Sequence, residues 1–406
     1  MNIFRLSWKY LVDRPLNTGL NVLLLALGLS IITVLLLVEE QFENKMNRDA
    51  AGIDMVIGAK GSPLQLVLSS VYHVDFPTGN IPLKEAQKVS RNRLIKNAIP
   101  MALGDNYKGF RIVGSNHDYL NLYQAEFAAG SVWDKPFEVV LGSTVAKAKG
   151  FQLGDTFIGA HGIEAASHEH DQYPFKVVGI LAPTNNVLDQ LIVTSVESVW
   201  YAHDDEIGPE KLDQEVNGTG FPESDQDREL TTVLIAYRNP MAAIQLPRMI
   251  NSRTSLQAAS PTFEITRLFE LLGIGVTVIK GLALLIIIIA GLGIFIALYN
   301  SLKERKYDLA VMRAIGAAKS QLFLLILLEG VILTLLGAIG GLVLGHFFLF
   351  FIVITYEEGL VSGFNAIMFV DKEWWIIVYA LIVGIGASII PAWNAYKGDI
   401  AGQLSK

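Results

Sequence analysis

Four long, mostly apolar runs with almost no charged residues constrain this chain more than any other feature of its sequence. They cover residues 15–38, 281–302, 320–356 and 374–396. The third run is 37 residues long and contains only Glu329 and His346 as ionisable groups. A helix rises about 1.5 Å per residue, so about 20 apolar residues cross the hydrocarbon core of a bilayer. Each run therefore predicts one membrane-spanning helix, since even the third is too short for two spans and a turn.

These runs divide the chain into the segments of an integral membrane protein. We expect an α-helical membrane protein with four transmembrane helices and a large mixed α/β extracytoplasmic domain inserted between the first and the second helix. The expected segments are an N-terminal cytoplasmic segment (1–15), transmembrane helices (16–38, 274–302, 321–354 and 374–396), the outer domain with its stalk helices (39–273), a cytoplasmic coupling segment (303–320), an outer loop (355–373) and a cytoplasmic tail (397–406). The first helix is expected to remain as an anchor, because residues 38–41 lack the small side chains of a signal-peptide cleavage site.

Lys and Arg residues predict the orientation, because cytoplasmic loops of membrane proteins carry an excess of them. The two ends of the chain and segment 303–320 together hold ten Lys and Arg against four Asp and Glu. Residues 39–273 hold 20 Lys and Arg against 30 Asp and Glu. Both termini are therefore expected in the cytoplasm and the large domain outside. The acidic balance, with a net charge of −7, argues against nucleic acid as a partner.

The outer domain has the pattern of a mixed α/β fold. Short runs rich in β-branched residues and bounded by Gly, Pro or Asn predict strands at 110–116, 137–143, 175–181, 190–196 and 231–237. Helical patterns occupy 83–95, 143–151 and 241–253, and those at 39–50 and 263–280 predict stalk helices that continue the first two spans outward. The chain contains no cysteine, so disulfides and thiolate metal ligands are excluded for these 406 residues.

The segment between the second and third runs is a short amphipathic stretch, KYDLAVMRAIGAAKSQL, at residues 306–322. Helical spacing predicts one stripe that contains Leu309, Met312, Ile315 and Gly316, and Gly316 is expected to break the helix. Such a helix can lie among lipid headgroups, or it can insert into a groove of a cytoplasmic ATPase. The pattern alone leaves both interpretations open.

The region that follows carries a resemblance to a known family. Residues 303–345 resemble the MacB/FtsX-type permeases of ABC transporters, with Glu304 and Arg305, then Arg-Ala-Ile-Gly-Ala at 313–317, Glu329, and glycines at 337, 340, 341 and 345. Asp308 stands where the family usually has Glu. Residues 391–404 are similar to the family's closing segment, although Ile400 replaces a proline, and residues 142–157 resemble a motif of its outer domain.

The resemblance implies a permease subunit in a bacterial inner membrane, with its large domain in the periplasm. It implies a dimer of identical or different permease chains and a separate cytoplasmic ABC ATPase, contacted through Glu304, Arg305, Asp308, Met312, Arg313, Ile315 and Gly316. These 406 residues contain no G-x-x-x-x-G-K-[ST] motif, so the chain is not expected to be an enzyme, and ATP and Mg²⁺ are expected in the partner.

Within the family, we expect mechanotransmission from the ATPase to the periplasmic domain for export or for handling a substrate outside the cytoplasm. A lipoprotein-releasing LolC/LolE-like permease and an FtsX-like regulator of cell-wall hydrolases are the alternatives. A periplasmic accessory protein or a lipoprotein, and membrane lipid, are the further expected partners.

Three other groups of residues have both a functional and a structural interpretation. Glu329 lies inside an apolar run, where a charge is costly, and could pair with a cytoplasmic Arg or Lys or serve structure alone. Gly337, Gly341 and Gly345 share one helix face, which suits close helix packing either within the chain or across a dimer. A zinc site or a merely solvated loop would explain the outer-domain cluster His161, His168, His170, Asp171 and His203.

Overall fold

The computed structural model describes residues 3–161, 173–204, 208–224, 227–355 and 364–397. The chain forms two compact units. Met1–Glu43 and Leu271–Lys406 make up the first, called here the helical unit, and Asn44–Glu270 make up the second, called the sheet unit. The sheet unit is thus one continuous stretch of sequence, as a domain inserted between two helices would be.

The helical unit is built from long apolar helices and a few short ones. Its elements are α1 (Ile3–Val12), most of α2 (Pro15–Asp49), most of α10 (Pro261–Glu304), α11 (Lys306–Ala314), α12 (Lys319–Thr355), the short helix η2 (Asp371–Glu373) and α13 (Trp374–Lys397). Among the described residues, four helices are long and apolar enough to cross a membrane: α2, α10, α12, and η2 together with α13. The predicted four apolar helices and mixed α/β domain are confirmed.

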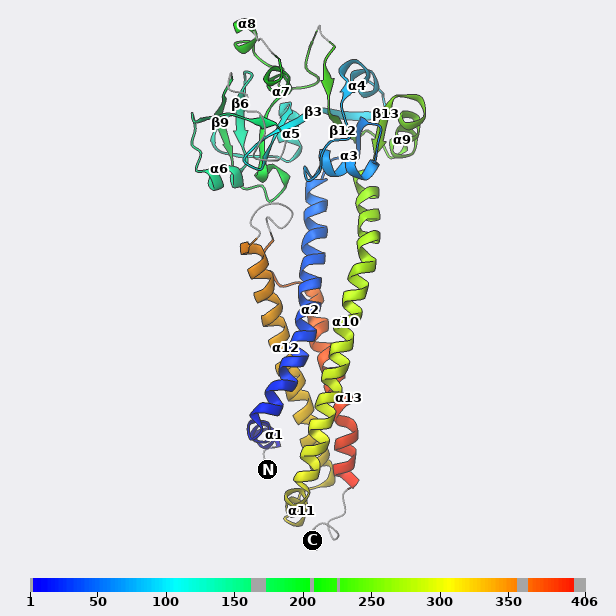
Figure 1. The fold of residues 1–406 in the computed structure, drawn as a ribbon. Helices are drawn as coiled ribbons and strands as arrows, with labels where there is room; N and C mark the ends of the chain where they lie inside the picture. The colour runs from blue at the N-terminus through cyan, green and yellow to red at the C-terminus, as the bar shows by residue number, and fades with distance from the viewer. Residues whose placement is uncertain (1–2, 162–172, 205–207, 225–226, 356–363, 398–406) are drawn as a thin grey trace. The chain divides into compact units, whose positions relative to one another are not determined.

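The four long helices lie side by side and share a core (Figure 1). Leu25 of α2, Ala290 of α10, Leu333 of α12 and Ala380 of α13 are buried in one cluster. Leu282 on α10 is among many large apolar side chains that face outward. Helices in a bilayer need no polar outer face, because lipid tails are as apolar as leucine.

The sheet unit is organised around one large mixed sheet. Among the described residues its strands run in the order β13 (Leu256–Ala259), β1 (Met55–Ala59), β12 (Thr232–Tyr237), β3 (Ile95–Tyr107), β4 (Phe110–Ser115), β10 (Leu191–Ser195), β6 (Glu138–Leu141), β9 (Phe175–Leu181) and β5 (Phe127–Gly130). Two short strands join its sides, β7 (Thr156–Phe157) on β9 and β8 (Ala160–His161) on β3. A separate pair is formed by β2 (Ile81–Pro82) and β11 (Glu229–Leu230).

Helices cover this sheet and close two hydrophobic clusters. They are α3 (Pro63–Ser70), α4 (Leu83–Ser90), α5 (His117–Leu122), α6 (Ser143–Lys149), α7 (Val196–Ala202), α8 (Pro209–Leu212), the short helix η1 (Val187–Gln190) and α9 (Met241–Arg253). One cluster contains Val233, Leu246 and Trp200, and the other contains Ile112 and Val177. The long strand β3 pairs with β12 over its first half and with β4 over its second, so it joins the two parts of the sheet.

The five predicted strands of the outer domain coincide with β4, β6, β9, β10 and β12 within two residues at either end. The helix expected over residues 83–95 was too long, because α4 ends at Ser90 and Ile95 already begins β3. The Asn92 side chain accepts a hydrogen bond from the amide of Leu94 (3.0 Å) and so forms the turn that ends the helix.

α2 and α10 enter the sheet unit at neighbouring strands. α2 ends at Asp49 shortly before β1, and α10 begins at Pro261 shortly after β13. β1 and β13 pair with each other, antiparallel, with Val56 opposite Ala259. The end of α2 is also held by the Tyr123 hydroxyl, which donates to the carbonyl of Asp49 (2.5 Å). Both helices are therefore joined to one edge of the same sheet.

Candidate functional site

The turn between α10 and α12 carries the residues expected to contact an ATPase. α10 ends at Glu304, and α11 follows directly and ends at Ala314. Gly316 has a φ of +106°, which L side chains rarely adopt, although no neighbouring atom would meet a Cβ there. The amide of Ala317 donates to the carbonyl of Met312 (3.0 Å) across this turn. Gly316 therefore ends the helix, as predicted, through its backbone conformation.

One face of α11 packs on the adjoining ends of α12 and α13. Leu309 is buried in a cluster with Leu322 of α12 and Ala392 of α13. Met312 is partly buried against the same cluster. The apolar side of the amphipathic pattern is thus used for packing within the chain.

Ile315 does not belong to this packed face, although helical spacing predicted it there. It is 82% exposed, because α11 ends at Ala314 and the helical spacing stops with it. Tyr307, on α11 itself, is 64% exposed, and Asp308 beside it is exposed too. Tyr307 and Ile315 leave two large apolar side chains uncovered on the segment.

Glu329 is buried in α12 beside a basic residue of the turn. Arg305 Nη1 lies 3.2 Å from Glu329 Oε1, and the two side chains are 13% and 5% exposed. Arg305 Nη2 also donates to the carbonyl of Tyr10 (3.2 Å), and the guanidinium carbon lies 3.8 Å from the centre of the Tyr10 ring. Arg305 therefore ties α11 to both α12 and α1. Sequence reasoning missed Tyr10, which carries no charge and lies far away in sequence.

Two other predicted residues make contacts beside this pair. Glu304 forms an ion pair with Arg14, which precedes α2. Arg313 Nη1 donates to the carbonyl of Ala317 (3.5 Å). The turn is thus held both by an ion pair to the residue before α2 and by a hydrogen bond within the turn itself.

The three glycines of α12 face α2. A Cβ added to Gly337 would lie 2.7 Å from Leu25 Cδ2, and one on Gly341 would lie 2.7 Å from Leu29 Cβ. A Cβ on Gly345 would lie 2.5 Å from Thr33 Cβ. The structure thus places this face in a close packing of two helices within the chain.

The histidine cluster is only partly within the described residues. His161 lies in β8, opposite Asp105 of β3, whereas His168, His170 and Asp171 lie outside the described residues. His203 follows α7, and its Nε2 lies 3.5 Å from Asp105 Oδ1. Within the described part of the chain, no three His, Asp or Glu residues are placed to hold a metal ion.

A second buried polar cluster occurs at the other end of α12 and was not predicted. His346 Nε2 lies 3.0 Å from Glu373 Oε2, and Glu373 is fully buried. Asn365 and Gln41 of α2 exchange two hydrogen bonds nearby (2.6 and 3.1 Å). Two features of the sequence could have indicated this cluster: His346 is an ionisable residue inside the third apolar run, and Glu373 directly precedes the fourth.

Two family models match this chain. A model described as FtsX-like permease C-terminal matches residues 280–400, and one described as MacB-like periplasmic core domain matches residues 18–240, more than half of the chain. The chain belongs to the MacB/FtsX-like family of ABC-transporter permeases. The first match contains α11, α12 and α13, and the second contains most strands of the sheet unit.

The permease is also similar to individual proteins. The macrolide export ATP-binding/permease protein MacB of Vibrio parahaemolyticus is 27% identical over 128 residues, which are 32% of this chain and 19% of that protein. The permease thus matches only about a fifth of the relative's length. The periplasmic region of MacB from Actinobacillus actinomycetemcomitans covers 56% of this chain and 98% of its own at 13% identity, with a TM-score of 0.35. The extracellular domain of the ABC-type transporter YknZ from Gram-positive bacteria covers 51% and 99% at 10% identity, with a TM-score of 0.31.

Proposed function

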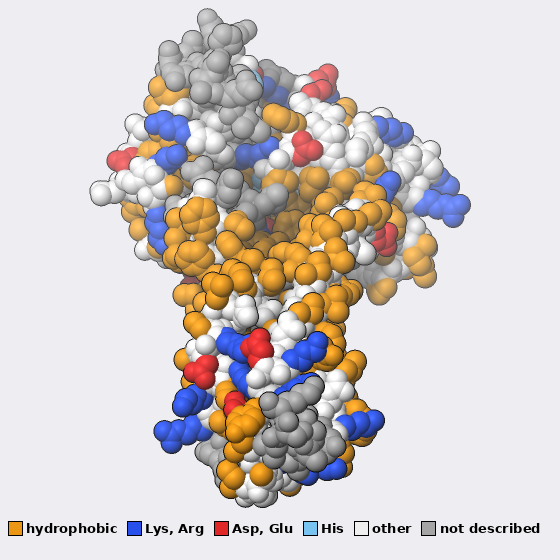
Figure 2. Space-filling model, turned by 60° about the horizontal axis from the view of Figure 1, so that its bottom comes forward, with side chains coloured by type: hydrophobic (Ala, Val, Ile, Leu, Met, Phe, Trp, Pro, Cys, Tyr) orange, Lys and Arg blue, Asp and Glu red, His pale blue; other side chains and the backbone are white. Residues whose placement is uncertain are grey.

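We propose that this chain is the permease subunit of an ATP-driven transporter, and that it passes movement from a separate cytoplasmic ATPase to its outer domain. The orientation is the first part of the proposal. Lys and Arg side chains gather around the end of the helical unit formed by α11 (Figure 2). Since positive residues are retained on the cytoplasmic side, this end faces the cytoplasm and the sheet unit lies in the periplasm.

The ATPase binds α11 in this proposal. Its inner face is fixed by Leu309 in the cluster with α12 and α13, and its first turn by the Arg305–Glu329 pair. Tyr307 and Ile315 are exposed on the outside. A partner that covers these two side chains would bind α11 and the residue after it. Because α11 packs on α12 and directly follows α10, its movement would also move α12 and the end of α10.

Movement then reaches the outer domain through α2 and α10. Both are unbroken helices of 35 and 44 residues, and each contributes residues to both units. Because they join the paired strands β1 and β13, a shift of one helix along the other would act on a single pair of strands. This arrangement suits rigid-body transmission, and no substrate needs to cross the bilayer.

The family matches favour this proposal over a regulator of cell-wall hydrolases. The periplasmic core domain that matches residues 18–240 is of the MacB type. Release of a lipoprotein would use the same transmission with a different substrate. ATP hydrolysis, with its Mg²⁺, is assigned to the partner, and a second permease chain would complete the membrane part.

The observation that carries the proposal is the exposure of Tyr307 on the packed helix α11 and of Ile315 directly after it. Full-length protein carrying Tyr307→Asp and Ile315→Asp should lose the P-loop ATPase subunit that accompanies the wild type in mild detergent, together with its ATP hydrolysis. Met241→Asp/Ile244→Asp is the matched control, because these two side chains are 53% and 72% exposed on α9 of the sheet unit. If the ATPase stays bound to the Tyr307/Ile315 variant, the coupling role is wrong.

A further inference from the structure

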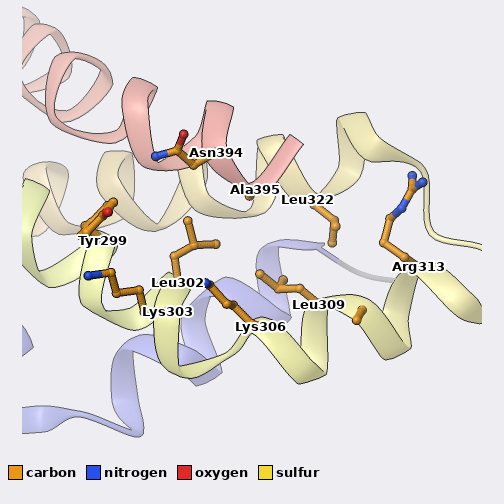
Figure 3. A pocket seen from close by; sticks show the side chains of 10 residues that line it. Tyr299, Leu302, Lys303, Lys306, Leu309, Arg313, Leu322, Asn394 and Ala395 are labelled. Atoms are coloured by element: carbon orange, nitrogen blue, oxygen red, sulfur yellow. The ribbon is translucent and has the colours of Figure 1, made fainter. Parts of the chain in front are cut away.

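A cavity of about 340 Å³ lies between α11 and the ends of α10, α12 and α13. Figure 3 shows its lining, with Lys303, Lys306 and Arg313 on the α10–α11 side and Asn394 and Ala395 of α13 across from them. Its volume is at the lower end of the range of small-molecule sites, about 300–1,000 Å³. The cavity belongs to the helical unit alone.

The lining is cationic on one side and apolar on the other. Three of its ten residues are Lys or Arg, and among the described residues no Asp or Glu lines it. The Nε atom of Arg313 is buried and has no hydrogen-bond partner among the described residues. The apolar part is formed by Leu302, Leu309 and Leu322. Three Lys and Arg side chains beside leucine side chains fit a ligand that combines an anion with a hydrocarbon part.

The surroundings place this cavity at the level of lipid headgroups. Lys303 Nζ lies 4.7 Å from the centre of the Tyr299 ring, and Lys397 Nζ lies 5.3 Å from that of Trp393. Trp and Tyr gather at membrane–water interfaces, and Lys and Arg extend there to the headgroups. The cytoplasmic leaflet is rich in anionic lipids, which attract basic residues next to the membrane.

We propose that this cavity binds the phosphate headgroup of an anionic phospholipid of the cytoplasmic leaflet, with Lys306 and Arg313 holding the phosphate. The leucine side holds the glycerol and the start of the acyl chains. The lipid then lies against α11 and fills the space between it and α13. This inference rests on the proposed orientation, because it requires α11 to face the anionic leaflet.

Native mass spectrometry of the full-length protein in mild detergent tests the site. The probes are phosphatidylglycerol and phosphatidylcholine with identical acyl chains. Wild type is expected to bind phosphatidylglycerol more tightly. Lys306→Gln/Arg313→Gln should weaken that binding by roughly 30-fold, because each residue that contacts the phosphate contributes a net hydrogen bond of about 1 kcal/mol, a factor of about five. Lys306→Arg/Arg313→Lys, which keeps both charges, should retain most of it.

The matched control removes two charges at the same end of the unit. Lys319→Gln/Lys397→Gln should change the affinity by less than about three-fold, because neither residue lines the cavity. Circular dichroism melting of each variant separates lost binding from lost fold.

Three results would overturn the site. They are equal losses in the two Gln pairs, equal binding of the two lipids, and displacement of phosphatidylglycerol by equimolar inorganic phosphate, which would indicate a free-phosphate site. Lipid binding is measured without the ATPase, so an ATPase that stays bound to the Tyr307→Asp/Ile315→Asp variant, with phosphatidylglycerol binding as expected, would refute the coupling role alone.

Discussion

Removing one charge of the Arg305–Glu329 pair should destabilise the helical unit far more than removing both. The two charged atoms lie 3.2 Å apart. At an effective dielectric constant of about 20, two unit charges at that distance attract each other by about 5 kcal/mol. Both side chains are largely buried, so a charge left alone would not regain its water. Breaking such a pair typically costs about 3–5 kcal/mol.

We therefore expect Glu329→Met and Arg305→Met each to lower the free energy of unfolding by about 3–5 kcal/mol. The double variant should lose only about 1–2 kcal/mol, mainly the contacts of Arg305 with Tyr10, because no buried charge is left alone. Reversible unfolding in mixed micelles of a mild detergent and dodecyl sulfate, followed by circular dichroism, measures all four proteins.

The ion pair of Lys280 with Glu39 is the control for this cycle. Its atoms are closer, at 2.8 Å, but the side chains are 43% and 44% exposed. Exposed pairs contribute about 0–1 kcal/mol, so Lys280→Met should have little effect. Single variants at Arg305 or Glu329 that cost less than about 1 kcal/mol, or a double variant as unstable as the worse single one, would refute the reasoning.

Gly341→Ala should lower the free energy of unfolding by about 1–3 kcal/mol, because its Cβ would meet Leu29. Gly386→Ala is the control and should be neutral or slightly stabilising, because no atom lies within 4 Å of a Cβ there. Equal melting temperatures of the two variants in detergent would contradict this. Burial, helped by Arg111, lowers the pKa of His73 to about 3 from an ordinary 6.5. Below about pH 6.5 the unfolded chain therefore binds a proton at His73 that the folded chain does not bind. The free energy of unfolding is then unaffected above about pH 6.5 and should fall by about 2 kcal/mol between pH 7 and pH 5. Asparagine tolerates the φ of +54° at this position, so His73→Asn should make stability less dependent on pH. Thermal unfolding followed by the circular dichroism of the β-sheet measures this, and an unchanged pH profile would contradict the role of His73.

Local patterns predicted the four long apolar helices, four of the shorter helices and five of the strands. The apolar runs became α2, α10, α12 and α13, because a hydrocarbon environment requires long uninterrupted helices whatever they pack against. The break at Gly316 was also predictable, since it depends on one residue's backbone freedom. The prediction that Ile315 lies on the packed face was wrong. Helical spacing applies only while the helix continues, and α11 ends one residue before Ile315.

The partners of the site residues were less accessible to sequence reasoning. A basic partner for Glu329 was one of two open interpretations, but nothing local selected Arg305, which is 24 residues away, or Tyr10 beside it. Likewise, the spacing of Gly337, Gly341 and Gly345 predicted a close contact without naming α2 as the helix that makes it.

The sequence by itself determined where the four long apolar helices lie and which segments are basic, because these follow from neighbours a few residues apart. Only the tertiary structure decided which faces meet: Gly341 against Leu29, Arg305 against Glu329, and β1 against β13. Such contacts join residues far apart in the chain, and they form only where shape and charge fit across the whole packed unit.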